Sequence, residues 1–239
     1  TAISRGFKLM APNEDQVIQD GVAQMPDIVK DIIKERPKLS FDNADIYLFE
    51  YVFLYIIIKI LDNYQRGYDK QDLLKSITAL SGIKKYFVDP RPVQWIITAL
   101  EYLVDDTKTI DDILGIKHDV PDLSNTITMM LYLVASFKVS VREAFKLHLS
   151  LIGRLEMVST QVAGISNYYF IVIPFMIGFW TRTIKNNPKD FENHSFLLEK
   201  GLSKVEGENL DKKLKTLFKV LVHHLNYEPN KDEERWLDH

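Results

Sequence analysis

The sequence contains no cysteine, and this absence excludes several kinds of chemistry at once. Disulfide bonds, thiolate nucleophiles and zinc sites built on sulfur all require that residue. Phosphate-binding loops are missing too, since the chain has neither a G-x-x-x-x-G-K-[ST] nor a G-x-G-x-x-G stretch. The H-E-x-x-H and G-x-S-x-G motifs of hydrolases are also absent. These absences favour binding over catalysis, and we expect no cofactor and no metal.

A surplus of positive charge is lacking as well. The 239 residues hold 30 Lys and Arg against 33 Asp and Glu, which gives a formal net charge of -3. Proteins that bind nucleic acids usually carry a concentrated basic face. The sequence therefore predicts no nucleic-acid partner. Glycine and proline are few, at 10 and 9 positions, and 46% of the residues are hydrophobic, which is typical of a globular protein.

The chain has no hydrophobic run long enough to span a membrane. Its longest run, YYFIVIPFMIGFW, covers the thirteen residues 168–180, whereas a membrane helix needs about 20 apolar residues. Pro174 and Gly178 interrupt it, and Arg182 follows it. We expect a helix buried on all sides and kinked at the proline. No signal-peptide pattern opens the sequence, and together with the missing cysteine this favours a cytoplasmic protein without membrane contact.

Helical periodicity is what the sequence has in abundance, so we predict an all-α protein. We expect one domain over 1–239, with short helices in 1–40, a helical core in 41–228 and a charged tail in 229–239. The spacing of the helix starts suggests about 8–10 helices. It is typical both of an orthogonal bundle and of a short stack resembling an α-solenoid.

Local signals predict several helix ends. Gly67 follows a long apolar helix and is a natural C-terminal stop. Another helix should start at Arg91 or Pro92, because proline is favoured in the first turn. Ser140, followed three residues later by Glu143, has the spelling of a capping box.

The most conspicuous polar segment is LVDDTKTIDDILG, which contains Asp105, Asp106, Asp111 and Asp112. Paired aspartates resemble the D-D-x-x-D motif of prenyl synthases, but Thr109 stands where that motif needs its third carboxylate. Three interpretations remain: a solvated connector that caps the next helix, a surface that binds a partner, and a weak magnesium site. The connector is the favoured interpretation, and the partner-binding surface comes second.

A second group of residues lies around the kinked apolar helix. Arg154, Tyr168, Tyr169 and Trp180 could line a pocket, since aromatic side chains and a few polar groups are typical of ligand sites. The same residues could form a buried hydrogen-bonded network without a ligand, which is the favoured alternative. His148 lies in a strongly apolar segment, and we expect it to be buried with its hydrogen bonds satisfied.

These observations together predict a non-enzymatic module that binds another protein. A bacterial immunity or antitoxin protein that neutralises its toxin by direct binding is a concrete case. Its partner would be a cationic toxin domain, recognised by the aspartates at 105, 106, 111 and 112. The alternatives are a helical enzyme or small-molecule receptor with a pocket beside the kinked helix, and a helical-repeat scaffold.

Overall fold

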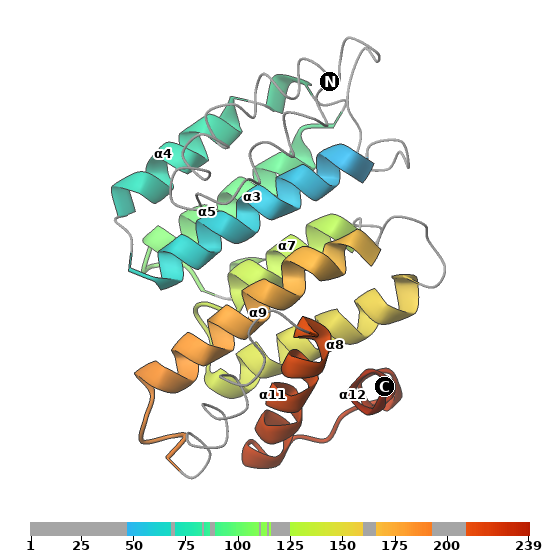
Figure 1. Ribbon diagram of the computed structural model, residues 1–239. Coiled ribbons are helices and arrows are strands. Elements are labelled where there is room, and N and C mark those ends of the chain that lie inside the picture. Colours follow the sequence, from blue (N-terminus) through green and yellow to red (C-terminus); the bar gives the residue numbers. More distant parts are fainter. Residues whose placement is uncertain are drawn as a thin grey trace. The chain divides into compact units, whose positions relative to one another are not determined.

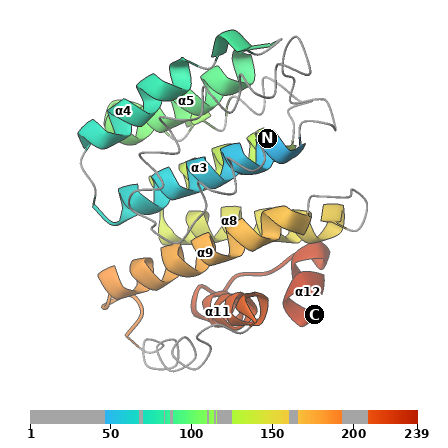
Figure 2. The same cartoon turned by 45° about the horizontal axis from the view of Figure 1, so that its top comes forward.

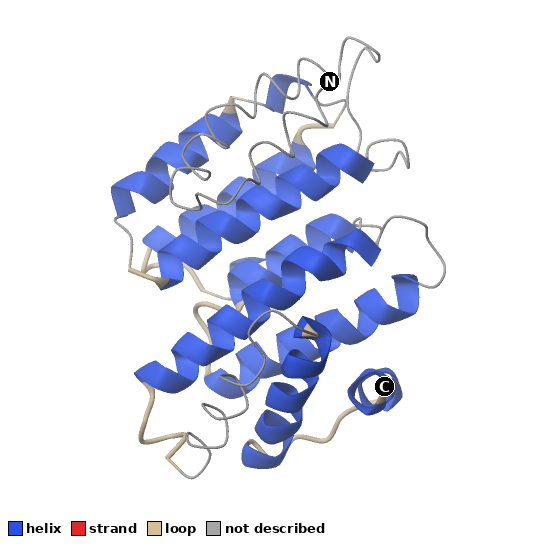
Figure 3. Ribbon diagram, in the orientation of Figure 1, coloured by secondary structure: helices blue, strands red, loops and turns tan. Residues whose placement is uncertain are grey.

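The computed structural model describes residues 47–67, 70–82, 84–86, 89–109, 111–113, 115, 125–159, 166–192 and 209–239. Within these ranges every regular element is a helix and no strand occurs (Figure 1, Figure 3). The prediction of an all-α protein is therefore confirmed. The helices expected in residues 1–40 and between 193 and 208 lie outside the described residues.

The chain divides into two compact units, Thr1–Lys138 and Val139–His239, called here the N-terminal and the C-terminal unit. Each has its own buried apolar residues and its own set of packed helices. The expectations of a single domain, and of a bundle or a solenoid, stay predictions.

The described part of the N-terminal unit contains several α-helices and a short 3-10 helix (Figure 1). They are α3 (Tyr47–Gln65), α4 (Lys70–Ser81), η2 (Lys84–Tyr86), α5 (Arg91–Val104) and α7 (Asn125–Ala135). Helix α5 packs against both α4 and α7, and α3 packs against the same two helices. The close pairing of α4 with α5 is clear in Figure 2.

The buried side chains of α5 show why this segment is a helix. Val93, Ile96, Ile97, Leu100 and Leu103 are all buried, and they recur at intervals of three and four residues. This spacing places them along one face of a helix, which the neighbouring helices cover. The apolar stripe therefore fixes how α5 lies in the unit.

The predicted helix ends agree with the structure. Helix α5 begins at Arg91 with Pro92 in its first turn. Gly67 follows the end of α3 with φ of +90°, a left-handed conformation that glycine adopts at low cost. The Ser140 hydroxyl accepts a hydrogen bond from the backbone N–H of Glu143 at 3.2 Å, so Ser140 caps the helix that follows it.

The C-terminal unit contains α8 (Val141–Ser159), α9 (Ser166–Asn186), α11 (Leu210–His224) and α12 (Lys231–Asp238). Helix α8 packs against α9 and α12, and α11 packs against the same two helices (Figure 2). Each of the four helices thus has two neighbours within the unit.

The apolar run 168–180 lies in α9, which continues through Pro174. Pro174 is exposed between the buried residues Ile173 and Phe175. The expectation that this helix is buried on all sides is therefore wrong. The carbonyl group that loses its helical donor at the proline can then be hydrated. No helix among the described residues combines the length and apolarity of a membrane span.

Residues 229–239 were predicted to be a charged tail, but they contain α12. Asn230 and Glu233 form a complete capping box: the Asn230 Oδ1 accepts from the Glu233 N–H at 2.9 Å, and the Glu233 Oε1 accepts from the Asn230 N–H at 3.0 Å. Trp236 and Leu237 are buried. Charge dominates this segment's composition, yet its two apolar residues and its cap are enough to dock a short helix.

Helix α12 lies close to α8 at Gly153. A Cβ atom at Gly153 would lie 3.6 Å from both the Cγ and the backbone N of Glu233, which is ordinary van der Waals contact. The space above Gly153 therefore accepts a methyl group, but a longer side chain would meet the backbone of α12.

We expect Gly153→Ala to raise the free energy of unfolding by up to about 1 kcal/mol, because alanine is the better helix former and its methyl group fits. Gly153→Leu should lower the same quantity by about 1–3 kcal/mol, because its side chain overpacks the contact with α12. Urea denaturation of the full chain measures both changes. Equal stability of the wild type and the Leu variant would show that α12 does not pack here.

Candidate functional site

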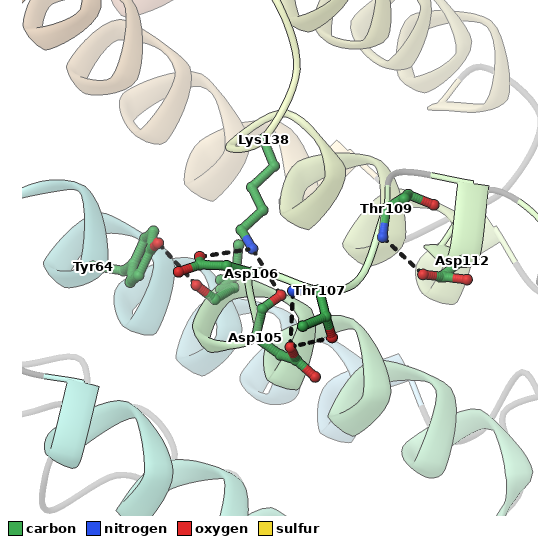
Figure 4. A network of polar contacts seen from close by, with 8 residues as sticks. Tyr64, Asp105, Asp106, Thr107, Thr109, Asp112 and Lys138 are labelled. Carbon is green, nitrogen blue, oxygen red and sulfur yellow. Dashed lines mark hydrogen bonds and ion pairs between the residues drawn. The ribbon is translucent and has the colours of Figure 1, made fainter.

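The predicted acidic residues lie in the segment 105–112, called here the acidic connector, which follows the C-terminal end of α5 (Figure 4). Tyr64, near the end of α3, and Lys138, just after α7, reach the same place. The ring of Tyr64 also contacts Phe137 edge-on, with 5.6 Å between the ring centroids. Three helix ends of the N-terminal unit therefore meet at this connector.

The connector begins where the backbone carbonyls of α5 lose their helical partners. The Tyr64 hydroxyl donates to the Leu103 carbonyl at 3.1 Å. The Lys138 ammonium donates to the Asp105 carbonyl at 3.2 Å, and the N–H of Lys108 donates to the same oxygen at 3.3 Å. Side chains from two other helix ends thus complete the C-terminus of α5.

Two of the four aspartates stabilise the connector itself. The Asp105 Oδ1 accepts from the N–H of Thr107 at 2.9 Å and from its hydroxyl at 2.6 Å. These hydrogen bonds, the hydroxyl bond foremost, hold the pKa of the Asp105 carboxyl below its usual range. The Asp112 Oδ2 accepts from the Thr109 N–H at 2.8 Å, while residues 111–113 form a helical turn. Both carboxylates therefore have a local structural role, as the connector interpretation predicts.

The other two aspartates extend into solvent. The Asp106 side chain is 88% exposed, and its Oδ1 lies 3.8 Å from the Lys138 Nζ. Asp111 is exposed in the helical turn. An ion pair this long and this exposed contributes little to stability. Asp106 and Asp111 are thus the carboxylates of the connector that are best placed to meet a partner.

Lys138, like Tyr64, is a residue of this site that the sequence did not reveal. Its side chain is 20% exposed, and its Nζ lies 4.6 Å from the centroid of the Tyr102 ring, a cation–π distance. It stands 33 residues after Asp105, so no local spacing connects the two. Only the packing of α7 against α5 brings them together.

The tyrosines beside the connector remain protonated over the physiological range. Burial raises the pKa of Tyr64, and the charge of Asp106 raises it further. Burial also raises the pKa of Tyr102, with added effects from Asp112 and Asp111. Tyr64 therefore keeps the proton that it donates to α5.

The residues of the predicted pocket lie in the C-terminal unit. Arg154 is exposed on α8, whereas Trp180 on α9 is fully buried, so the two side chains end in different surroundings. Tyr168 and Tyr169 belong to α9, and their side chains lie outside the description. The Trp180 Nε1–H donates to the His148 Nδ1 at 2.9 Å, a partner that sequence spacing did not suggest.

Within the described ranges, no three His, Asp or Glu side chains gather closely enough to hold a metal ion. The ring of His224 stacks on Phe191 instead, with 4.9 Å between the centroids.

We expect Asp105→Ala to lower the melting temperature more than Asp106→Ala does. The first substitution removes the acceptor of two hydrogen bonds in the turn, whereas the second removes a side chain that is almost fully in solvent. Calorimetry on the two variants gives the comparison. A larger effect of Asp106→Ala would contradict the roles assigned to these two carboxylates.

Comparisons with protein-family models, with curated proteins and with solved structures find no match for this chain.

Proposed function

We propose that the protein is a non-enzymatic binding module that recognises a cationic surface of another protein through the acidic connector. The observation that supports this proposal most is that the four aspartates have different structural roles. Asp105 and Asp112 accept hydrogen bonds from the backbone, and Asp106, Asp111 and Asp112 are exposed. Asp106 and Asp111 are thus exposed next to residues whose backbone these hydrogen bonds hold.

Order before binding matters because immobilising a flexible loop opposes association. Asp105 and Asp112 form hydrogen bonds within the connector, and Lys138 binds it to the end of α7. Tyr64 holds the last turn of α5, from which the connector starts. Little conformational entropy is then lost when a partner docks on it. This argument favours recognition over a merely solvated linker.

The electrostatics of the connector favour a cationic partner. The C-terminal end of a helix carries a partial negative charge, and α5 ends at Asp105. The exposed carboxylates of Asp106 and Asp111 add full negative charges close by. Lys138 offsets a part of this charge. Complementary charge accelerates encounter with a basic surface and fixes its orientation.

A bacterial immunity or antitoxin protein is the concrete case that we propose. Such a protein would cover the cationic active surface of a toxin, for instance a nuclease, by direct contact. The absence of nucleotide-binding and hydrolase motifs agrees with a role that needs no catalysis.

The test starts with affinity capture from the native host and continues with calorimetric titration of the captured protein. The double variant Asp106→Lys/Asp111→Lys should bind at least about tenfold more weakly, a loss of about 1.4 kcal/mol. Its affinity should also depend less on salt, because fewer opposite charges approach each other.

The control is Asp190→Lys/Asp238→Lys, which makes the same change of charge at two exposed positions of the C-terminal unit. This variant should keep wild-type affinity. If both double variants bind as tightly as the wild type, the connector is not the interface. If both bind equally weakly, net charge rather than the connector determines binding.

A further inference from the structure

A buried histidine lies in the interior of the C-terminal unit. His148 on α8 has no exposed surface, and three aromatic side chains of α9 surround its ring. The centroid distances are 4.7 Å to Phe179, 5.6 Å to Trp180 and 6.4 Å to Phe175. These contacts place the imidazole in an apolar layer between α8 and α9.

The hydrogen bond to Trp180 determines the protonation state of this imidazole. An indole N–H can only donate, so the His148 Nδ1, which lies 2.9 Å from it, must carry a lone pair. The proton of the neutral ring is then on Nε2. Among the described residues, this Nε2 is buried and finds no hydrogen-bond partner. The one hydrogen bond of the ring therefore exists only while His148 is neutral.

Uptake of a proton changes both the bond and the charge. A proton on Nδ1 would point at the indole N–H, so two donors would face each other and the bond would break. The positive charge would be enclosed by aromatic rings, away from water. Burial alone lowers the pKa of His148 to about 3, whereas an exposed histidine titrates near about 6.5.

The charged groups of the surrounding helices are engaged elsewhere. Glu233 of α12 accepts the capping hydrogen bond of its own helix, and the guanidinium of Arg182 on α9 lies over Gly178. Lys215 of α11 pairs with Asp211 at 2.9 Å. The charged residues of α8 on the turns around His148 are exposed: Arg142, Glu143 and Lys146. Burial is the cause that lowers the pKa of His148, and it is not offset by a neighbouring charge.

We propose that the Trp180–His148 hydrogen bond is an acid-sensitive latch of the C-terminal unit. It ties α9 to α8 while His148 is neutral, and one proton from solvent, bound at Nδ1, opens it. The aromatic side chains around the ring then separate to admit water to the imidazolium. The C-terminal unit thereby loses stability under acid.

The direction of the effect follows from the two protonation states. The unfolded chain binds a proton at this histidine at a higher pH than the folded chain does, so its contribution to stability is complete at neutral pH. This contribution declines as the pH falls from about 6.5 toward about 3, and each pH unit in the middle of that window lowers the folding equilibrium constant about tenfold.

The variant His148→Asn tests the latch in the full chain. Its amide oxygen can replace Nδ1 as the acceptor for Trp180, but it does not titrate. Urea unfolding of the C-terminal unit is measured between about pH 7 and about pH 4. In this range, proton binding to the unfolded chain at position 148 lowers the stability of the folded chain. The wild type should lose stability more steeply than this variant, by close to tenfold in the equilibrium constant per pH unit. Equal slopes would overturn the proposal.

The matched control is Glu233→Gln, because Glu233 is a second buried side chain of this unit that carries an ionisable group. The steeper loss of stability with falling pH that His148 causes should persist when Glu233 is replaced by Gln. Its loss there would assign the acid sensitivity to Glu233 and overturn the proposal.

A direct measurement avoids any dependence on the folding of the variants. NMR of the wild-type imidazole, assigned with His148→Gln, should show a neutral ring down to about pH 4, below the range of an exposed histidine. The indole N–H resonance of Trp180 should shift when the ring finally charges. A ring that titrates near about 6.5 while the chain remains folded would overturn the latch.

Discussion

A helix cannot satisfy its own last carbonyl groups, and at the end of α5 this constraint organises the surrounding part of the N-terminal unit. Tyr64 and Lys138 supply the missing donors from two other helix ends. Because these donors arrive from α3 and from the residues after α7, the three helices are held together at one point. The acidic connector starts at this point, and Lys138 holds its first residue, Asp105.

Aromatic contacts join the helices of the C-terminal unit. The rings of Phe145, Trp180, Phe218 and Trp236 form a continuous series of edge-on pairs across α8, α9, α11 and α12. Each such pair contributes about 0.5–1.5 kcal/mol beyond the area that it buries. These four helices of the described part of the unit therefore share one apolar interior, and His148 contacts it through Trp180.

Sequence reasoning succeeded where the signal was local. The helical class followed from periodicity, and the ends at Gly67, Arg91 and Ser140 followed from residues that act on their immediate neighbours. It failed for α12, where charged composition concealed the capping residue Asn230 and the buried Trp236.

The other differences between the expected and the observed sites come from side-chain contacts that helical spacing does not predict. The four aspartates were visible in the sequence, but the division of their roles depends on hydrogen bonds with Thr107, Thr109 and Lys138. Trp180 was visible as a site residue, yet its partner His148 is 32 residues away on another helix. Helical spacing predicts which face of a helix is buried, and it does not predict which side chain of another helix covers it.

The position of α12 has a consequence for the order in which the C-terminal unit is assembled. Its neighbour α8 lies far back in the chain, and the Arg142 guanidinium joins the Leu225 carbonyl across 83 residues. Closing so long a loop costs conformational entropy before any contact compensates it. An isolated helix of eight residues is also too short to be stable in water. Helix α12 can therefore form only on a surface that α8 and α11 have already built. Packing of α8 and α11 must precede the formation of α12.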